Sequence, residues 1–170
     1  MCRPYNAQAA VEPVLQLIVA QALTQQTNDK QQLIPMIERV REQAGQKVRQ
    51  VLADSGYCSE ENLLKAAKRK IDLYVATGKQ KHNHPAPASP WGRIPNSATP
   101  VDRMKRKLTT RTGHTIYARR KTIVEPVFGQ IKQAQGFRQF LLRGVEKVRS
   151  EWALVCATHN VLKLYRACRA

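Results

Sequence analysis

The first 45 residues combine a strand-like pattern with a helix-like one. Apolar and small residues follow strand spacing over residues 5–12 and 15–24. Glu12-Pro13 marks a tight connection between the two runs, which predicts a hairpin. A helical pattern then follows the cap residues Asn28-Asp29 and stops at Gly45.

The next segments continue the alternation of strand and helix. Residues 48–53 predict a short strand that ends at Asp54, and residues 71–76 predict a third buried strand. Between them, Ser59 predicts a helix cap, with three apolar residues on the core face: Leu63, Leu64 and Ala67. The order hairpin, helix, strand, helix, strand predicts an α/β fold with a mixed sheet and covering helices.

The second half of the chain begins with a loop and ends in helices. Residues 77–100 are rich in proline, glycine and basic residues, which predicts a mobile basic loop. A short basic helix through about Thr110, a turn at Gly113 and a longer helix over about 116–134 follow. The last helix is predicted over about 145–166. Its expected core face holds Val148, Trp152, Val155, Val161, Leu162 and Tyr165.

The net charge of the chain indicates which kind of partner it binds. The chain of 170 residues has 29 Lys and Arg against 12 Asp and Glu, a net charge of +17. Such an excess favours a polyanionic partner, above all nucleic acid. No apolar run approaches the ~20 residues of a membrane span, and the start lacks the pattern of a signal peptide, so we expect a cytoplasmic protein. The four cysteines lack metal-ligand spacing, and we expect them to be reduced thiols. We expect His82 and His84 to lie in a solvated loop.

Two carboxylates stand where chemistry is plausible. Asp54 follows a strand, at the end where open α/β sheets present functional side chains, although Asp before Ser-Gly is also a common turn residue. Glu125 lies on a predicted helix face with Lys121 and Lys132, as a metal ligand beside phosphate-binding cations or as part of an ordinary exposed ion pair. Pro126, unusual within a helix, predicts a local kink there.

Four longer motifs indicate a resemblance to a known protein family. The runs YNAQAAVE, LIVAQALTQQTNDKQQL, VLADSGYCSEENL and YARRKTIVEPVFGQIKQAQGFRQFLLRG resemble bacterial insertion-sequence transposases of the DDE type. The resemblance covers nearly the whole chain outside the proline-rich loop. It implies a ribonuclease-H-like fold and a site in which two Asp and one Glu hold two divalent ions, Mg²⁺ or Mn²⁺.

The resemblance also implies roles for particular residues. Asp54 matches the second Asp of the family and Glu125 its Glu, both as catalytic metal ligands. Three positions are similar to the DNA-binding signature on the helix of that Glu: Tyr117, Arg120 or Lys121, and Lys132. Arg120 and Lys121 compete for one position because the Arg-to-Glu gap is one residue longer than usual. Double-stranded DNA, as transposon ends and target, is the implied partner, and a homodimer is compatible with it.

One departure limits the expected activity. The first Asp of the family lies on a first strand upstream of the hairpin, and no segment of this chain matches that strand. Glu12 is expected to be non-catalytic, Asp72 begins a strand, and Asp102 is expected to cap a helix. We therefore expect residues 1–170 to be a partial, inactive transposase catalytic domain. The alternative is a basic nucleic-acid-binding module without enzymatic activity.

Overall fold

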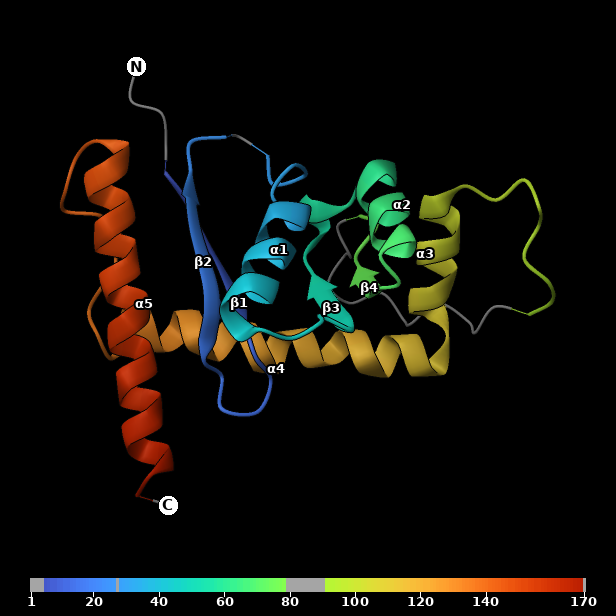
Figure 1. Cartoon of the computed structure of the whole chain (residues 1–170). Helices are drawn as coiled ribbons and strands as arrows, with labels where there is room; N and C mark the ends of the chain where they lie inside the picture. The colour runs from blue at the N-terminus through green and yellow to red at the C-terminus, as the bar shows by residue number, and fades with distance from the viewer. Residues whose placement is uncertain (1–4, 27, 79–90, 170) are drawn as a thin grey trace. The chain divides into compact units, whose positions relative to one another are not determined.

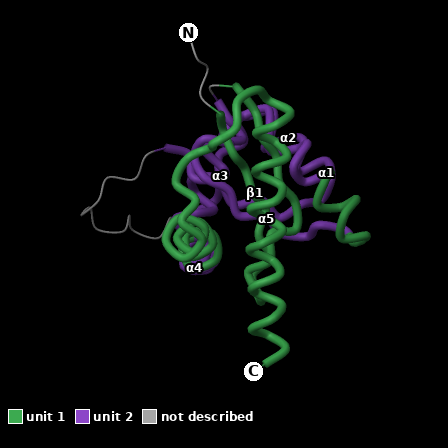
Figure 2. The backbone as a smooth tube through the Cα atoms, turned by 90° about the vertical axis from the view of Figure 1, so that its left-hand side faces the viewer, with its two compact units in different colours: residues 1–27, 38–46, 121–170 green, residues 28–37, 47–120 purple. Residues whose placement is uncertain are grey.

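The computed structural model describes residues 5–26, 28–78 and 91–169 (Figure 1). These residues form two compact units, each assembled from separate stretches of the chain (Figure 2). Unit 1 contains residues 1–27, 38–46 and 121–170, and unit 2 contains residues 28–37 and 47–120. Half of the predicted mobile loop, residues 79–90, lies outside the described residues.

Unit 1 begins with the expected hairpin. Strand β1 (Asn6–Val11) pairs antiparallel with β2 (Ile18–Thr24), with an irregularity between Ala10 and Val11. The carboxylate of Glu12 accepts hydrogen bonds from three backbone N–H groups of the connection, those of Val14, Leu15 and Leu17. Glu12 therefore stabilises the turn that joins the two strands.

Helix α5 (Val145–Ala167) packs on β2 in the same unit. Trp152 is buried at its centre, where the indole Nε1 donates to the carbonyl of Gln8 at 3.1 Å and the ring stacks against Phe128. Farther along, the Asn160 side chain bonds both the N–H and the carbonyl of Ile18. These contacts tie the helix to both strands of the hairpin.

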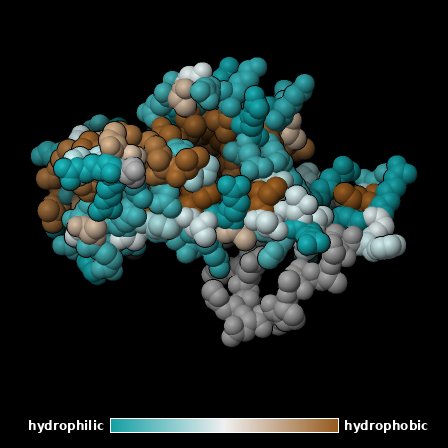
Figure 3. Space-filling model, turned by 90° about the horizontal axis from the view of Figure 1, so that it is seen from below, coloured by the Kyte–Doolittle hydropathy of each residue, from teal (hydrophilic) through white to brown (hydrophobic). Residues whose placement is uncertain are grey.

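The predicted core face of α5 is confirmed only in its first half. Val148 and Trp152 are buried and Val155 packs partly against the same core, whereas Val161, Leu162 and Tyr165 are exposed. The structure instead buries Cys156 and His159. Hydrophobic atoms lie exposed at the left of the molecule, where α5 lies (Figure 3). The pattern was wrong there because helical spacing identifies an apolar face but not how much of its length has a partner.

Unit 2 is built on a parallel strand pair. Strand β3 (Gln50–Ala53) pairs in register with β4 (Asp72–Val75), and α2 (Glu60–Lys68) forms the crossover between them. Helix α3 (Pro100–Thr109) and the first residues of α1 (Leu33–Ala44) add apolar side chains to this core. The Lys107 ammonium contacts Asp72 and the Leu73 carbonyl, which holds α3 against the start of β4.

The cap of α2 is as predicted, but its buried face agrees with the prediction only at Leu63. Ser59 accepts a hydrogen bond from the Asn62 N–H and so caps the helix. Leu63 is buried, yet Leu64 is exposed and the remaining buried positions are Asn62 and Ala66. The Asn62 amide donates to the carbonyls of Lys30 and Tyr57, which explains why a polar residue takes a core position.

The helical second half differs from the prediction at one point. Helix α4 (Arg111–Gln133) begins directly after α3, so the predicted turn at Gly113 lies inside its first turn. A Cβ on Gly113 would lie 1.9 Å from the Lys107 carbonyl oxygen. Glycine is needed here for the close approach of two helices and not for a turn. Thr99, not Asp102, is the cap residue of α3, and Asp102 completes the capping box.

The fold class is confirmed as mixed α/β. Among the described residues, hydrogen bonds join β1 to β2 and β3 to β4 in two two-stranded sheets, one in each unit. The single mixed sheet that would include both pairs stays a prediction. No helix in the described ranges is both long and apolar enough to span a membrane.

Candidate metal and DNA site

Asp54 follows β3 at its C-terminal end, as predicted. Its backbone is extended (φ −78°, ψ 166°), and its Oδ1 accepts a hydrogen bond from the Ser55 N–H at 2.7 Å. Asp54 thereby caps the 3-10 turn η1 (Ser55–Tyr57). The side chain is nevertheless 61% exposed. The turn-forming interpretation is thus confirmed, and the same residue still presents carboxylate oxygens to solvent.

Two residues of α4 contact the end of β3 within unit 2. The Arg120 Nη1 lies 3.9 Å from Asp54 Oδ2, and the Arg120 side chain is only 19% exposed. The Tyr117 hydroxyl donates to the carbonyl of Ala53 at 3.3 Å. The Arg120 guanidinium also lies 5.8 Å from the centre of the Tyr117 ring. The structure therefore brings together three of the predicted site residues: Asp54, Tyr117 and Arg120.

The surroundings of Asp54 raise the pKa values of two nearby tyrosines, Tyr57 and Tyr117. Burial, with smaller contributions from Asp29 and Asp54, raises the pKa of Tyr57 to about 12. The pKa of Tyr117 is also raised, chiefly by burial and further by Asp54, although Arg120 opposes the shift. Both hydroxyls therefore keep their protons at neutral pH and can act as hydrogen-bond donors. The Nε of Arg120 is buried without a hydrogen-bond partner among the described residues.

The other predicted residues lie farther along α4, in unit 1. Lys121, Glu125 and Lys132 are all exposed. At about 100° per residue, the three side chains fall within roughly 40° of one another around the helix axis. No ion pair in the described part of the chain joins Lys121 to Glu125. The alternative interpretation required an ion pair between Glu125 and Lys121, and this pair is absent from the described residues. The helix continues through Pro126.

The remaining acids considered from the sequence have structural partners. Asp72 contacts Lys107 and accepts from the Gln50 amide, and Asp102 accepts from Thr99. Within the described residues, no group of three or more His, Cys, Asp or Glu side chains is arranged to hold a metal ion. His82 and His84 lie outside these residues. Asp54 and Glu125 therefore stay the candidate ligands, one in each unit.

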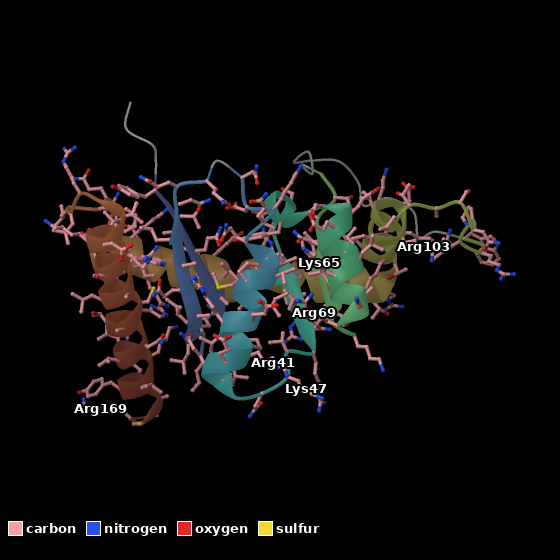
Figure 4. The ribbon with its side chains drawn as sticks, turned by 45° about the horizontal axis from the view of Figure 1, so that its top comes forward. Arg41, Lys47, Lys65, Arg69, Arg103 and Arg169 are labelled. Carbon is pink, nitrogen blue, oxygen red and sulfur yellow. The ribbon has the colours of Figure 1, made fainter. Side chains whose placement is uncertain are left out.

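Basic side chains surround the helices of unit 2. Lys65 and Arg69 of the α2 region and Arg103 of α3 are exposed and project from the ribbon (Figure 4). Lys65 also pairs with Glu61, one turn earlier on α2. Exposed cations of this kind suit a phosphate backbone, because each contact releases condensed counterions.

The sequence did not predict the two contacts between α4 and the end of β3, Tyr117 with Ala53 and Arg120 with Asp54. The distance from Ala53 to Tyr117 along the chain is 64 residues, and no local pattern predicts that a helix so far away touches the strand end. A resemblance did single out Tyr117 and Arg120, but as DNA contacts. The only signal within the sequence was their shared helix with Glu125.

An α/β protein with a strand-end carboxylate beside a guanidinium and a strongly basic surface has the features of proteins that act on nucleic acids. The family model of the transposase DDE domain matches residues 2–161. The chain therefore belongs to the transposase DDE domain family, whose members are DNA-binding proteins of mobile elements that act in transposition. Searches of curated proteins and of solved structures found no match to this chain.

Proposed function

We propose that this chain belongs to a transposase catalytic domain, which cleaves DNA phosphodiester bonds and transfers strands with divalent metal ions. Asp54 and Glu125 are the proposed metal ligands. The observation that carries the proposal is the contact between Asp54 and Arg120 of α4, the helix on which Glu125 lies five residues later.

The donor set suits Mg²⁺ or Mn²⁺. Both ions favour carboxylate oxygens and keep several water or phosphate oxygens as further ligands. The Asp54 Oδ1 accepts from the Ser55 N–H, but the side chain is more than half exposed. Glu125 is exposed and has no ion-pair partner among the described residues. When bound, such ions activate the attacking oxygen and stabilise the leaving oxygen. Two carboxylates without a third bridging acid hold an ion weakly, so we expect residues 1–170 alone to cleave little or no DNA.

Lys121, Lys132 and Arg120 are the proposed phosphate contacts. Lys121 and Lys132 are exposed on the helix face that carries Glu125, where they can bind the phosphates that flank a reacting bond. Arg120 is less accessible and lies beside Asp54, so Lys121 is the better candidate for the signature position that both residues could fill. A DNA contact by Tyr117 remains a prediction.

The ribonuclease-H-like fold is part of the same proposal. Among the described residues, each strand has one hydrogen-bonded neighbour. A parallel pair normally belongs to a larger sheet covered on both faces. β3 also has an exposed or half-exposed side chain at three of its four positions, from Gln50 to Leu52. These features support a larger, ribonuclease-H-like sheet to which the parallel pair belongs.

DNA binding by the +17 chain tests the proposal. Affinity for a duplex, measured by fluorescence anisotropy with EDTA present, is expected to fall steeply with salt and to depend weakly on sequence. K132Q is expected to weaken binding to all duplexes alike and to reduce the salt slope by about one. K147Q removes the same charge from an exposed position of α5 and serves as the matched control.

Two results would contradict this assignment. Equal effects of K132Q and K147Q would show general charge attraction in place of a defined phosphate site. An affinity that stays flat from low to physiological salt would remove the argument for phosphate contacts altogether. The alternative, a binding module without enzymatic activity, predicts the same salt dependence but no divalent ion at Asp54 and Glu125.

A further inference from the structure

We propose that Tyr117 is a positioning residue, which fixes the backbone that carries Asp54, and that its hydroxyl does not contact DNA. This inference rests on the proposed function, because it assigns Asp54 a metal ion to hold. The observation behind it is the Tyr117 hydroxyl, which reaches from α4 to the end of β3 and donates to the Ala53 carbonyl at 3.3 Å.

The position of Ala53 explains how the hydroxyl acts on Asp54. The Ala53 carbonyl belongs to the peptide plane that leads directly into Asp54, so a hydrogen bond to it restricts where the Asp54 Cα lies. Ala53 itself is buried, and it is paired in register with Val75, the last residue of β4. The hydroxyl thus lies at the C-terminal ends of both parallel strands.

Asp54 is held from two other directions. The Ser55 N–H fixes Oδ1 at 2.7 Å, and the Arg120 guanidinium lies 3.9 Å from Oδ2. Without the Tyr117 bond, these two side-chain contacts would have to orient the carboxylate on a backbone that ends its ladder at Ala53. A ligand carboxylate must be oriented within narrow limits, and the supporting hydrogen bonds of a metal site set its affinity.

The same geometry argues against a DNA contact by this hydroxyl. A phenol has one proton to donate, and Tyr117 donates it to Ala53 from a half-buried position. A phosphate that bound this hydroxyl as an acceptor would have to displace that bond. Lys121, one turn later and exposed, can approach a phosphate without such a loss.

The test compares Y117F with Y165F. Both remove one hydroxyl and keep the ring, and Tyr165 is exposed on α5. Mn²⁺ binding is measured by the electron paramagnetic resonance signal of the free ion, and DNA binding by anisotropy in EDTA. Y117F is expected to weaken Mn²⁺ binding about two- to tenfold, the range for one lost hydrogen bond, with DNA affinity unchanged. Y165F is expected to change neither quantity.

Each alternative outcome identifies what fails. If D54N lowers Mn²⁺ affinity but Y117F does not, the positioning role is wrong and the proposed metal site stands. If D54N has no effect on Mn²⁺ affinity, the proposed function and this inference both fail. Weaker DNA binding by Y117F in EDTA, with Mn²⁺ affinity unchanged, would assign the hydroxyl to DNA.

A second measurement covers the case in which Y117F does not fold. The chain with 3-fluorotyrosine at position 117 keeps the hydroxyl and provides a fluorine signal in nuclear magnetic resonance. Added Mn²⁺ is expected to broaden this signal, and duplex DNA in EDTA is expected to leave it in place. A shift on DNA addition, or a signal that Mn²⁺ leaves sharp, would overturn the positioning role.

Discussion

Trp152 allows a quantitative test of the unit 1 core. The residue is 2% exposed, its Nε1 bonds the Gln8 carbonyl at 3.1 Å, and two phenylalanine rings lie against it, those of Phe128 and Phe140. Truncation to alanine removes a large buried side chain and leaves a cavity, which costs about 3–5 kcal/mol. W152F retains an aromatic ring but leaves the Gln8 carbonyl without this donor, for which we expect a loss of about 1–3 kcal/mol.

Urea unfolding followed by far-ultraviolet circular dichroism measures both losses. W91A is the matched control, because Trp91 is 98% exposed and its truncation is expected to change stability by no more than about 0.5 kcal/mol. In a W91F background, Trp152 is the remaining tryptophan and its fluorescence reports unit 1 directly. If W152A and W91A shift the midpoint equally, Trp152 does not anchor a packed core and the description of unit 1 is wrong.

Two further predictions concern packing and pH. G113A forces a Cβ against the Lys107 carbonyl and is expected to destabilise the chain by about 1–3 kcal/mol in urea unfolding. G129A, in the same helix with open space around it, is expected to be neutral or stabilising, and equal effects would contradict the close approach. Burial lowers the pKa of His159 below its unfolded value of 6.5, so the unfolded state takes up the proton first. Stability is therefore expected to fall as pH decreases below about 6.5. H159Q should reduce this dependence and H114Q should not.

The local parts of the fold were predictable from the sequence. The hairpin, the short strands before Asp54 and Ala76, and the final helix all follow from spacing and cap residues within a few positions of each element. Gly45 also ends α1 with the positive φ that its type suggested, at 63°. These features depend on neighbours along the chain, which the sequence displays directly.

Features that depend on distant segments were not predictable in this way. Gly113 was interpreted as a turn, although its role is set by the carbonyl of Lys107 on another helix. Leu64 and Tyr165 fit apolar faces but lie where no described segment covers them. The parallel pairing of β3 with β4 also depends on distant segments, because spacing predicts a strand but not its partner.

In the candidate site too, the sequence predicted the residues but not the contacts between distant segments. Asp54 and Glu125 were identified from sequence motifs. The structure places Asp54 at the end of a strand and Glu125 on a helix, as predicted. The contacts of Tyr117 and Arg120 with the end of β3 came only from the structure. A motif identifies residue types that share a function, whereas their hydrogen bonds depend on how helix and strand pack.

We propose that Asp54 and Glu125 share one divalent ion. Mn²⁺ binding by D54N, E125Q and the double variant tests it most directly, with E146Q as a control for an exposed glutamate. If the ion is shared, each single substitution removes most of the affinity and the double variant binds no more weakly than either one. E146Q is expected to bind as the unaltered chain does. An E125Q variant that keeps full Mn²⁺ affinity while D54N loses it would contradict the shared site.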